Sequence, residues 1–401
     1  MATASPAADL RESVSSPAQR QRVALVRSGS HGTRGTRVLI VSSFVLPRRG
    51  GVEQFVDIAA GVLRERGSRV RVLACHPRDG AAAADVTIPS RFLRASGWPL
   101  PVGGWRTLWD EVGNADVVVA NGTRHLLPSL ATVAARLRRK KVLFVLHGSG
   151  APFSTSSFFY HRLLGTVFER LVTRPVLRLS QPVSLSRAGV AGARRRYGVT
   201  AAHVPFPLRD LPPARPRFLG AEQPIRIVWV GRLFREKNPV GAVAVLDQVR
   251  RHQGATLEMY GDGVLLEELE RLARDRPWLA VRESRSWEEI QQVQDAAHVC
   301  LSTSLRDATQ LAILEPLARG IPVVATRVGD APHYYADPQL DAFCVDPGDP
   351  RAAATAILEL ASVYERYVEQ FAANGARLRR VHDGGRERLG SLIDAVSNGQ
   401  S

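Results

Sequence analysis

The sequence predicts an α/β protein built from two domains, each organised around a parallel sheet. Short apolar runs alternate with segments whose apolar residues recur at helical spacing, as expected where buried strands alternate with helices. Residues 205–224 carry six prolines, a density that excludes a regular helix or a central strand. The same alternation restarts at Ile225, so we place the domain boundary in this proline-rich stretch.

Length and composition limit the function classes. The 401 residues suffice for two or three domains, and a net charge of +16 favours anionic partners: nucleotide phosphates, anionic lipid surfaces or nucleic acid. Three widely spaced cysteines, without CxxC or Cys/His spacing, suggest neither zinc nor a disulfide framework and fit a reducing compartment. No apolar run has the length of a transmembrane helix and no secretory signal is visible, so we expect a cytoplasmic protein.

The first domain begins after residues 1–34, which are rich in Ala, Ser, Arg and Gly and are predicted to form a disordered tail. The run VLIVSSF then predicts a buried strand, and apolar residues at helical spacing predict a helix that ends before Gly67. Gly50 and Gly51 lie at the turn between them. Glycines there let backbone N–H groups approach a phosphate at a helix N-terminus, although any tight turn also favours glycine.

Later in this domain, His147 ends the predicted strand VLFVLH and is followed by small residues. A histidine at that position either points into a cleft or satisfies local backbone groups. Residues 152–177 are aromatic and basic, with Phe153 and Phe158 among them, and predict an amphipathic helix. Such a stripe either packs in the core or binds a surface.

The loop that follows the first strand of the second domain carries Arg232 and Lys237. Two cations directly after a buried strand suit a diphosphate, because arginine binds it bidentately and lysine acts as a mobile point charge. The alternative is an ordinary solvated loop with weak surface ion pairs.

Residues 302–326 predict a loop, a helix that ends at Gly320, and the buried strand IPVVAT. Two acids, Asp307 and Glu315, lie eight residues apart near the junction of loop and helix. Ligands of open α/β sheets bind outside the carboxyl ends of the strands, where carboxylates accept hydrogen bonds from sugar or ribose hydroxyls. Alternatively, Asp307 caps the helix and Glu315 is an ordinary helical acid.

Five motifs, in one order along residues 37 to 370, resemble the retaining GT-B glycosyltransferases of glycosyltransferase family 4. The motifs are VSSFVLPRRGGVEQFVDIAAGVLRERG, VWVGRLFREKN, MYGDG, SLRDATQLAILEPLARGIPVVAT and VDPGDP. The resemblance implies the GT-B fold, in which two Rossmann-like domains face a cleft. We expect an acceptor-side domain over residues 35–208 joined by the final helix 375–401, a linker over 209–224, and a donor-binding domain over 225–374.

The resemblance also implies roles for single residues. Arg232 and Lys237 are expected on the donor diphosphate, Glu315 on the ribose hydroxyls and Asp307 on the donor sugar. Gly50 and Gly51 match the glycine turn beside phosphate and acceptor, and His147 matches a histidine near the transferred sugar. Leu311 completes the expected substrate-binding set. The sequence has no DxD motif, which fits metal-independent transfer, and no cofactor is expected besides the nucleotide-diphosphate sugar itself.

Two departures from the family pattern keep other functions open. Asp307 stands where the family usually has Glu, and Ala-Thr-Gln follows it in place of a Gly-Phe-Pro-like segment. A catalytically silent nucleotide-sugar-binding or scaffold protein and a sugar-nucleotide epimerase are the alternatives. The acceptor is expected to be lipid-linked, a polysaccharide or a small molecule. The basic clusters 138–141 and 194–196 suggest a peripheral position on an anionic membrane surface, and no nucleic-acid partner is expected.

Overall fold

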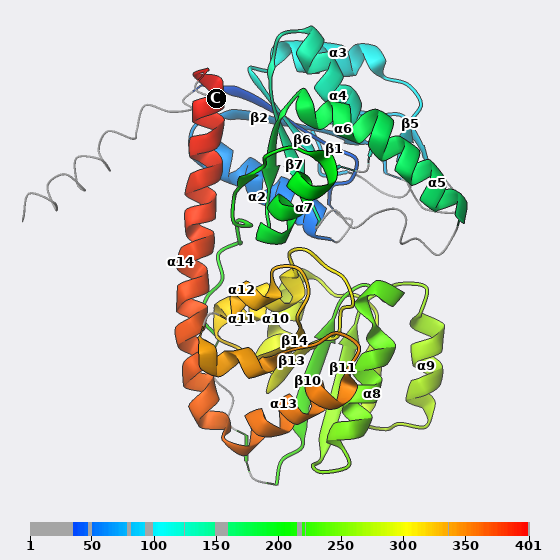
Figure 1. The fold of residues 1–401 in the computed structure, drawn as a ribbon, viewed down its shortest axis with the longest axis vertical. Coiled ribbons are helices and arrows are strands. Elements are labelled where there is room, and N and C mark those ends of the chain that lie inside the picture. The colour runs from blue at the N-terminus through cyan, green and yellow to red at the C-terminus, as the bar shows by residue number, and fades with distance from the viewer. Residues whose placement is uncertain are drawn as a thin grey trace, which may run out of the picture.

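The computed structural model describes residues 35–46, 50–77, 82–92, 99–123, 125–148, 159–214, 219–220, 222–335 and 337–399. The predicted tail over residues 1–34 and the aromatic residues Phe153 and Phe158 lie outside the described residues. Two α/β domains are stacked one above the other, and the long helix α14 (Tyr364–Ser397) runs along the side of both (Figure 1).

The N-terminal domain contains a seven-stranded parallel sheet in the order β3-β2-β1-β6-β7-β8-β9. The strands are β1 (Arg37–Ser42), β2 (Arg69–Cys75), β3 (Val86–Ile88), β6 (Val117–Asn121), β7 (Lys141–Leu146), β8 (Gln181–Ser184) and β9 (Ala202–His203). The central strands β1, β6 and β7 are buried on both faces along nearly their whole length, as expected for parallel strands between two helical layers. A short antiparallel pair, β4 (Ser90–Phe92) and β5 (Pro99–Pro101), lies outside the sheet.

Helices cover the two faces of this sheet with separate hydrophobic cores. One face packs against α2 (Gly51–Glu65) and the C-terminal part of α14. The other packs against α3 (Trp105–Asn114), α4 (Leu126–Leu137) and α6 (Arg174–Arg178). Helix α6 continues without a break from α5 (Phe159–Phe168) through one π-helical turn, Glu169–Thr173, and α7 (Arg187–Tyr197) follows β8. Three arginines in the last turn of α7 complement its dipole.

The C-terminal domain repeats this plan with a six-stranded parallel sheet in the order β12-β11-β10-β13-β14-β15. The strands are β10 (Ile225–Val230), β11 (Ala255–Tyr260), β12 (Leu279–Arg282), β13 (Val299–Ser302), β14 (Val323–Thr326) and β15 (Cys344–Val345). The helices are α8 (Pro239–Val249), α9 (Leu266–Arg274), α10 (Trp287–Asp295), α11 (Leu311–Arg319), α12 (Ala331–Tyr334) and α13 (Pro350–Ser362). Gly320 ends α11 with φ 86°, the left-handed conformation that the sequence predicted.

The last helix differs from its prediction. The final helix was expected to begin at Gly375, but the break lies at Val363, between α13 and α14, and α14 runs for 34 residues. Gly375 is not a helix breaker here: a Cβ at that position would lie 2.7 Å from the carbonyl oxygen of Leu317. Glycine is therefore needed where α14 packs closely on α11.

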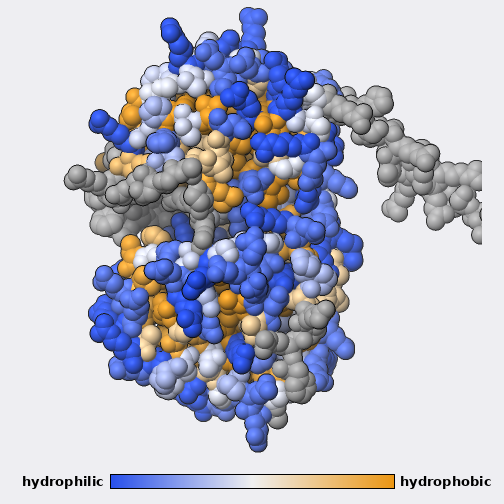
Figure 2. All heavy atoms as spheres, turned by 180° about the vertical axis from the view of Figure 1, so that it is seen from behind, coloured by the Kyte–Doolittle hydropathy of each residue, from blue (hydrophilic) through white to orange (hydrophobic). Residues whose placement is uncertain are grey.

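The rear surface is mostly hydrophilic, and hydrophobic residues reach it in patches on both domains (Figure 2). No helix among the described residues combines the length and the apolar character needed to cross a membrane.

Candidate active site

The predicted site residues lie where the carboxyl ends of the two sheets face each other, and one contact joins the domains directly. A Cβ at Gly51, in the first turn of α2, would lie 3.4 Å from Cδ1 of Leu311 at the start of α11. Gly50 precedes the helix with an extended backbone, φ 170°, and a Cβ there would meet the carboxylate of Glu53 at 2.6 Å. The glycine turn and Leu311 are thus neighbours across the cleft.

His147 follows β7 and is held by a buried polar network. Its Nε2 lies 2.5 Å from Oδ1 of Asn121, the last residue of β6. The Asn121 amide nitrogen donates to the hydroxyl of Ser42 and to the carbonyl oxygen of Val52, at 3.2 and 3.3 Å. A carbonyl oxygen only accepts, so the Asn121 oxygen must face His147. The imidazole then donates from Nε2, and its Nδ1 is left as an acceptor.

The surroundings of His147 keep the ring uncharged. The ring packs edge-on against Phe55 of α2, with centroids 5.3 Å apart. Burial lowers the pKa of His147 to about 3, and the positive charge of His125 acts in the same direction. A neutral histidine at this strand end suits a hydrogen bond with a hydroxyl.

The loop after β10 brings a cation and an acid together. Lys237 forms an ion pair with Asp307, and both side chains are largely shielded from solvent. The other oxygen of Asp307 accepts from the backbone N–H of Ala308 at 2.8 Å. Asp307 therefore does not cap α11; the N-cap residue is Gln310, which makes no side-chain cap. Arg232 is exposed, with its guanidinium 5.5 Å from the ring centre of Phe234.

Glycines of the MYGDG motif hold this loop in place. A Cβ at Gly261 would lie 1.8 Å from the carbonyl oxygen of Gly231, and one at Gly263 would lie 2.4 Å from that of Leu233. The N–H of Leu233 donates to the carbonyl of Asp262 at 2.9 Å. No larger residue fits at Gly261 or Gly263 while the loop that carries Arg232 and Lys237, the cationic loop, keeps its position.

Glu315 lies apart from the Lys237–Asp307 pair, on the buried side of α11. Its carboxylate accepts a hydrogen bond from the indole of Trp287 at 3.3 Å, and Arg209 stacks over that indole at 5.2 Å. Burial raises the pKa of Glu315 to about 7, although the indole and the charges of Arg209 and Arg319 oppose the rise. Glu315 is therefore not the ordinary helical acid that the sequence left open.

The Ala-Thr-Gln departure has a structural explanation. The Thr309 hydroxyl donates to the carbonyl of Leu185 in the N-terminal domain at 3.3 Å. The Gln310 side chain is 2% exposed, accepts from Ser302 and donates to the carbonyl of Val328. These residues fix the loop before α11 against both domains.

A further interdomain contact comes from Asp330, which is buried between β14 and α12. Its two carboxylate oxygens accept from the backbone N–H groups of Arg187 and Ala188, at 2.8 and 2.9 Å. The carboxylate of the C-terminal domain thus binds the positive end of α7 in the N-terminal domain.

Sequence reasoning missed Asn121, Asp330 and Trp287. Asn121 ends the buried strand β6 and Asp330 lies four residues after the buried strand β14, and a polar residue at such a position is the signal that could have found them. The partners of Asn121 and Asp330 lie in other elements, however, and could not be found in this way. Trp287 is the first residue of a helix, so it had no comparable position after a strand.

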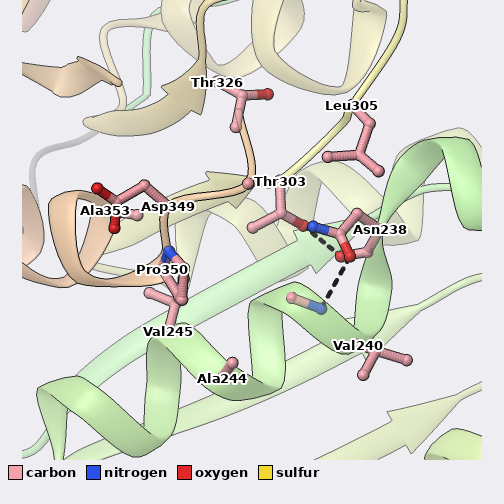
Figure 3. A pocket seen from close by; sticks show the side chains of 12 residues that line it. Asn238, Val240, Ala244, Val245, Thr303, Leu305, Thr326, Asp349, Pro350 and Ala353 are labelled. Carbon is pink, nitrogen blue, oxygen red and sulfur yellow. Dashed lines mark hydrogen bonds between the residues drawn. The ribbon is translucent and has the colours of Figure 1, made fainter. Parts of the chain in front are cut away.

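A cavity of about 380 Å³ opens beside the cationic loop (Figure 3). Asn238 lines it while its side chain accepts from the N–H of Gly241 and its carbonyl accepts from Thr303. None of the eight predicted site residues lines this cavity. It lies between α8, the ends of β13 and β14, and the start of α13, and is lined by Asn238, Val240, Gly241, Ala244, Val245, Thr303, Leu305, Thr326, Gly348, Asp349, Pro350 and Ala353.

Two parallel-sheet domains with a site between their carboxyl ends define the GT-B class of glycosyltransferases. The chain belongs to the group 1 glycosyltransferases and fits family 4: residues 49–206 match the family described as "Glycosyltransferase Family 4", and residues 224–362 match "Glycosyl transferases group 1". The protein is accordingly a glycosyltransferase.

Relatives and solved structures agree with this membership. The chain is 26% identical to a phosphatidylinositol N-acetylglucosaminyltransferase subunit from Arabidopsis thaliana over 338 residues, 78% of this chain and 72% of the relative. Its fold is similar to that of Anabaena HepE in complex with UDP and glucose, with a TM-score of 0.69 and 15% identity over 91% of this chain and all of that one. It is also similar to WaaG, a glycosyltransferase involved in lipopolysaccharide biosynthesis, with a TM-score of 0.62 and 16% identity over 89% of this chain and 99% of that one.

Proposed function

We propose that the protein is a retaining glycosyltransferase that moves a sugar from a nucleotide-diphosphate sugar to a lipid-linked acceptor. The observation that carries the proposal is the pairing of Lys237 with Asp307 beside the exposed Arg232, at the carboxyl ends of β10 and β13. A diphosphate binds to a cation, whereas a sugar hydroxyl donates a hydrogen bond to an acceptor. The Lys237–Asp307 pair offers a cation and an acceptor at one place.

The proposed chemistry follows from the charges. Breaking the anomeric C–O bond leaves negative charge on the diphosphate and a sugar with oxocarbenium character. Lys237 and Arg232 stabilise the leaving group electrostatically, so the proposed transfer is metal-independent. Asp307 and the Nδ1 atom of neutral His147 accept hydrogen bonds from sugar hydroxyls, and Glu315 binds the ribose. Retention of the anomeric configuration rests on the resemblance of residues 304–326 to the family motif.

The donor and acceptor classes draw support from the relatives. UDP and glucose are bound by the similar Anabaena protein, which favours a UDP sugar as the donor. The Arabidopsis relative is named for transfer to phosphatidylinositol, which favours a glycolipid acceptor over a polysaccharide or a small molecule. We place the reaction in the cytoplasm, at the inner face of the membrane.

A thermal-shift panel of UDP, GDP, ADP and TDP sugars tests the donor site. A ligand that binds only the folded state raises its stability by RT ln(1 + [L]/Kd). We expect one nucleotide to raise the melting temperature of the wild type but not of Arg232→Ala. Arg235→Ala is the matched control, because Arg235 is exposed in the same loop. No shift with any donor would overturn the proposal.

Product analysis separates the alternatives. A silent binding protein would give the thermal shift without a glycosylated product from any of the three acceptor classes. An epimerase would convert the donor when no acceptor is present. A new α-linked glycoside from an α-linked donor, analysed by NMR, is the outcome that a retaining transferase requires.

A further inference from the structure

The exposed apolar residues of the N-terminal domain gather on one helical layer. Nine large apolar side chains are exposed among the described residues of this domain that precede the linker, and every one lies on or next to α3, α4 or the continuous helix α5–α6. These helices cover the same face of the sheet, so their outer sides point the same way. The nine are Val102, Trp105, Trp109, Val133, Leu137, Leu163, Val167, Leu171 and Leu179.

The helix α5–α6 carries an apolar stripe followed by a basic one. Leu163, Val167 and Leu171 are spaced four residues apart and are 55%, 44% and 68% exposed. Arg170, Arg174 and Arg178 repeat the same spacing and are also exposed. Residues four apart lie near one another on a helix, so each set forms a stripe; the apolar stripe covers the first part of the helix and the arginine stripe the second, and the two meet at Arg170 and Leu171.

The acidic residue of this helix is turned away from that surface. Glu169 is 6% exposed and forms an ion pair with Arg196 of α7. Among the described side chains from Leu163 to Leu179, the exposed ones are therefore apolar, basic or uncharged.

Helix α4 extends the same surface. It packs next to α6 over the sheet and exposes Val133, Arg136 and Leu137, with no acid along its length. Arg139 is exposed in the turn that follows. We call the exposed side chains of α4 and α5–α6 the basic-apolar face.

We propose that the basic-apolar face docks on an anionic membrane surface. Such a surface offers acyl chains, among which leucines insert, and anionic headgroups, which attract arginines, so it matches the apolar and basic side chains of this face. A second copy of this chain fits less well, because a symmetric contact would bring the arginines of both copies into one interface, and no acid is exposed among the described side chains of this helix to pair with them.

The geometry connects this face to the cleft. Helix α6 ends just before β8 begins, so α5–α6 runs antiparallel to the strands. The α5 end of this helix therefore lies toward the carboxyl ends of the strands (Figure 1), and His147 follows the carboxyl end of β7. Docking would present the cleft to a lipid-linked acceptor, a consequence that rests on the proposed function.

Co-sedimentation of the whole chain with vesicles tests the docking. We compare phosphatidylcholine vesicles with vesicles that contain phosphatidylglycerol, at low and high salt. We expect binding only to the anionic vesicles, at least tenfold weaker for Leu163→Ser/Leu171→Asp and for Arg170→Gln/Arg174→Gln/Arg178→Gln. Val264→Asp and Arg271→Gln/Arg274→Gln are the matched controls: Val264 is 76% exposed and both arginines lie on α9, in the other domain.

Each outcome decides the point. Equal binding of the wild type to both vesicle types would overturn the proposal, and so would an equal loss of vesicle binding in the control variants. A dimer in solution that Leu171→Asp dissociates would also overturn it, because the face would then bind a second copy of the chain. The donor-induced thermal shift of the Leu163→Ser/Leu171→Asp variant reports both folding and the donor site. A normal shift without vesicle binding would support the docking face, whereas a missing shift in the wild type would refute the proposed function alone.

Discussion

Oδ1 of Asn121 lies 2.5 Å from Nε2 of His147, and this contact decides which imidazole nitrogen is free for a substrate. Two donors on the Asn121 amide are already used by Ser42 and Val52, so the amide has one orientation. The neighbouring strands β6 and β7 thus deliver a side chain and the group that orients it to the same edge of the sheet.

Replacing Asn121 by Asp should charge the imidazole. A carboxylate beside Nε2 favours the imidazolium, so the pKa of His147 should rise from about 3 to above its ordinary 6.5. Nδ1 would then become a donor, and transfer should fall by about 10²-fold, the scale of one lost catalytic contact. The ¹⁵N shifts of His147 measure the protonation directly, with buried His382 of α14 as an internal control. An unchanged neutral ring in Asn121→Asp would contradict the assigned role.

Glu315→Gln should stabilise the protein at high pH. The pKa of Glu315 is raised in the folded state to about 7 from 4.5, so the folded state holds its proton more tightly than the unfolded state does. Stability is therefore lost as pH rises between these values, by about 3 kcal/mol in total. A glutamine at this position does not titrate, so the variant does not lose this stability as the pH rises. Urea unfolding should show the variant more stable at pH 8, with the difference vanishing toward pH 4.5.

Asp307→Asn should tighten the binding of a nucleoside diphosphate. Asp307 pairs with Lys237 in the free protein, so its carboxylate competes with a diphosphate for Lys237. The negative charge of Asp307 also repels the diphosphate. Removing the charge should lower the Kd for the diphosphate product by roughly tenfold, the equivalent of about 1.4 kcal/mol. Titration calorimetry measures this Kd. The control Asp341→Asn, which breaks an exposed pair with Arg327, should leave the Kd unchanged. Weaker binding by Asp307→Asn would show that the carboxylate supports the phosphate site.

Asp330→Ala should loosen the closed arrangement of the domains. It removes a carboxylate that binds two N–H groups of α7 across the cleft. Asp349→Ala is a close control, since Asp349 accepts from two N–H groups of α13 within its own domain. Both changes should cost about 1 kcal/mol as lost caps. Only Asp330→Ala should increase the radius of gyration in X-ray scattering; equal radii would mean that this contact does not hold the domains together.

The sequence predicted the fold class and the places of several site residues for one physical reason. Buried parallel strands are recognised as apolar runs, and the residues that follow them lie at the carboxyl edge of the sheet, as His147 does directly after β7 and Lys237 does in the loop after β10. It did not predict which side chains touch. The partners of Asn121, Asp330 and Glu315 come from elements up to 143 residues away, and local spacing carries no information on such contacts.

Gly375 illustrates a second reason why the prediction from the sequence failed in places. In the sequence a glycine between two helical patterns suggests a break. In the structure the missing side chain allows α14 to approach α11, a requirement that only the tertiary arrangement creates.

The path of α14 also has a consequence for biosynthesis. Leu389, Ile393 and Val396 of α14 belong to the core cluster that covers one face of the N-terminal sheet, and Asp394 pairs with Arg66 there. These residues follow the C-terminal domain in the chain, so a ribosome makes them after both sheets. Until α14 emerges, the nascent N-terminal domain keeps part of that apolar face uncovered, which makes it a client for chaperones.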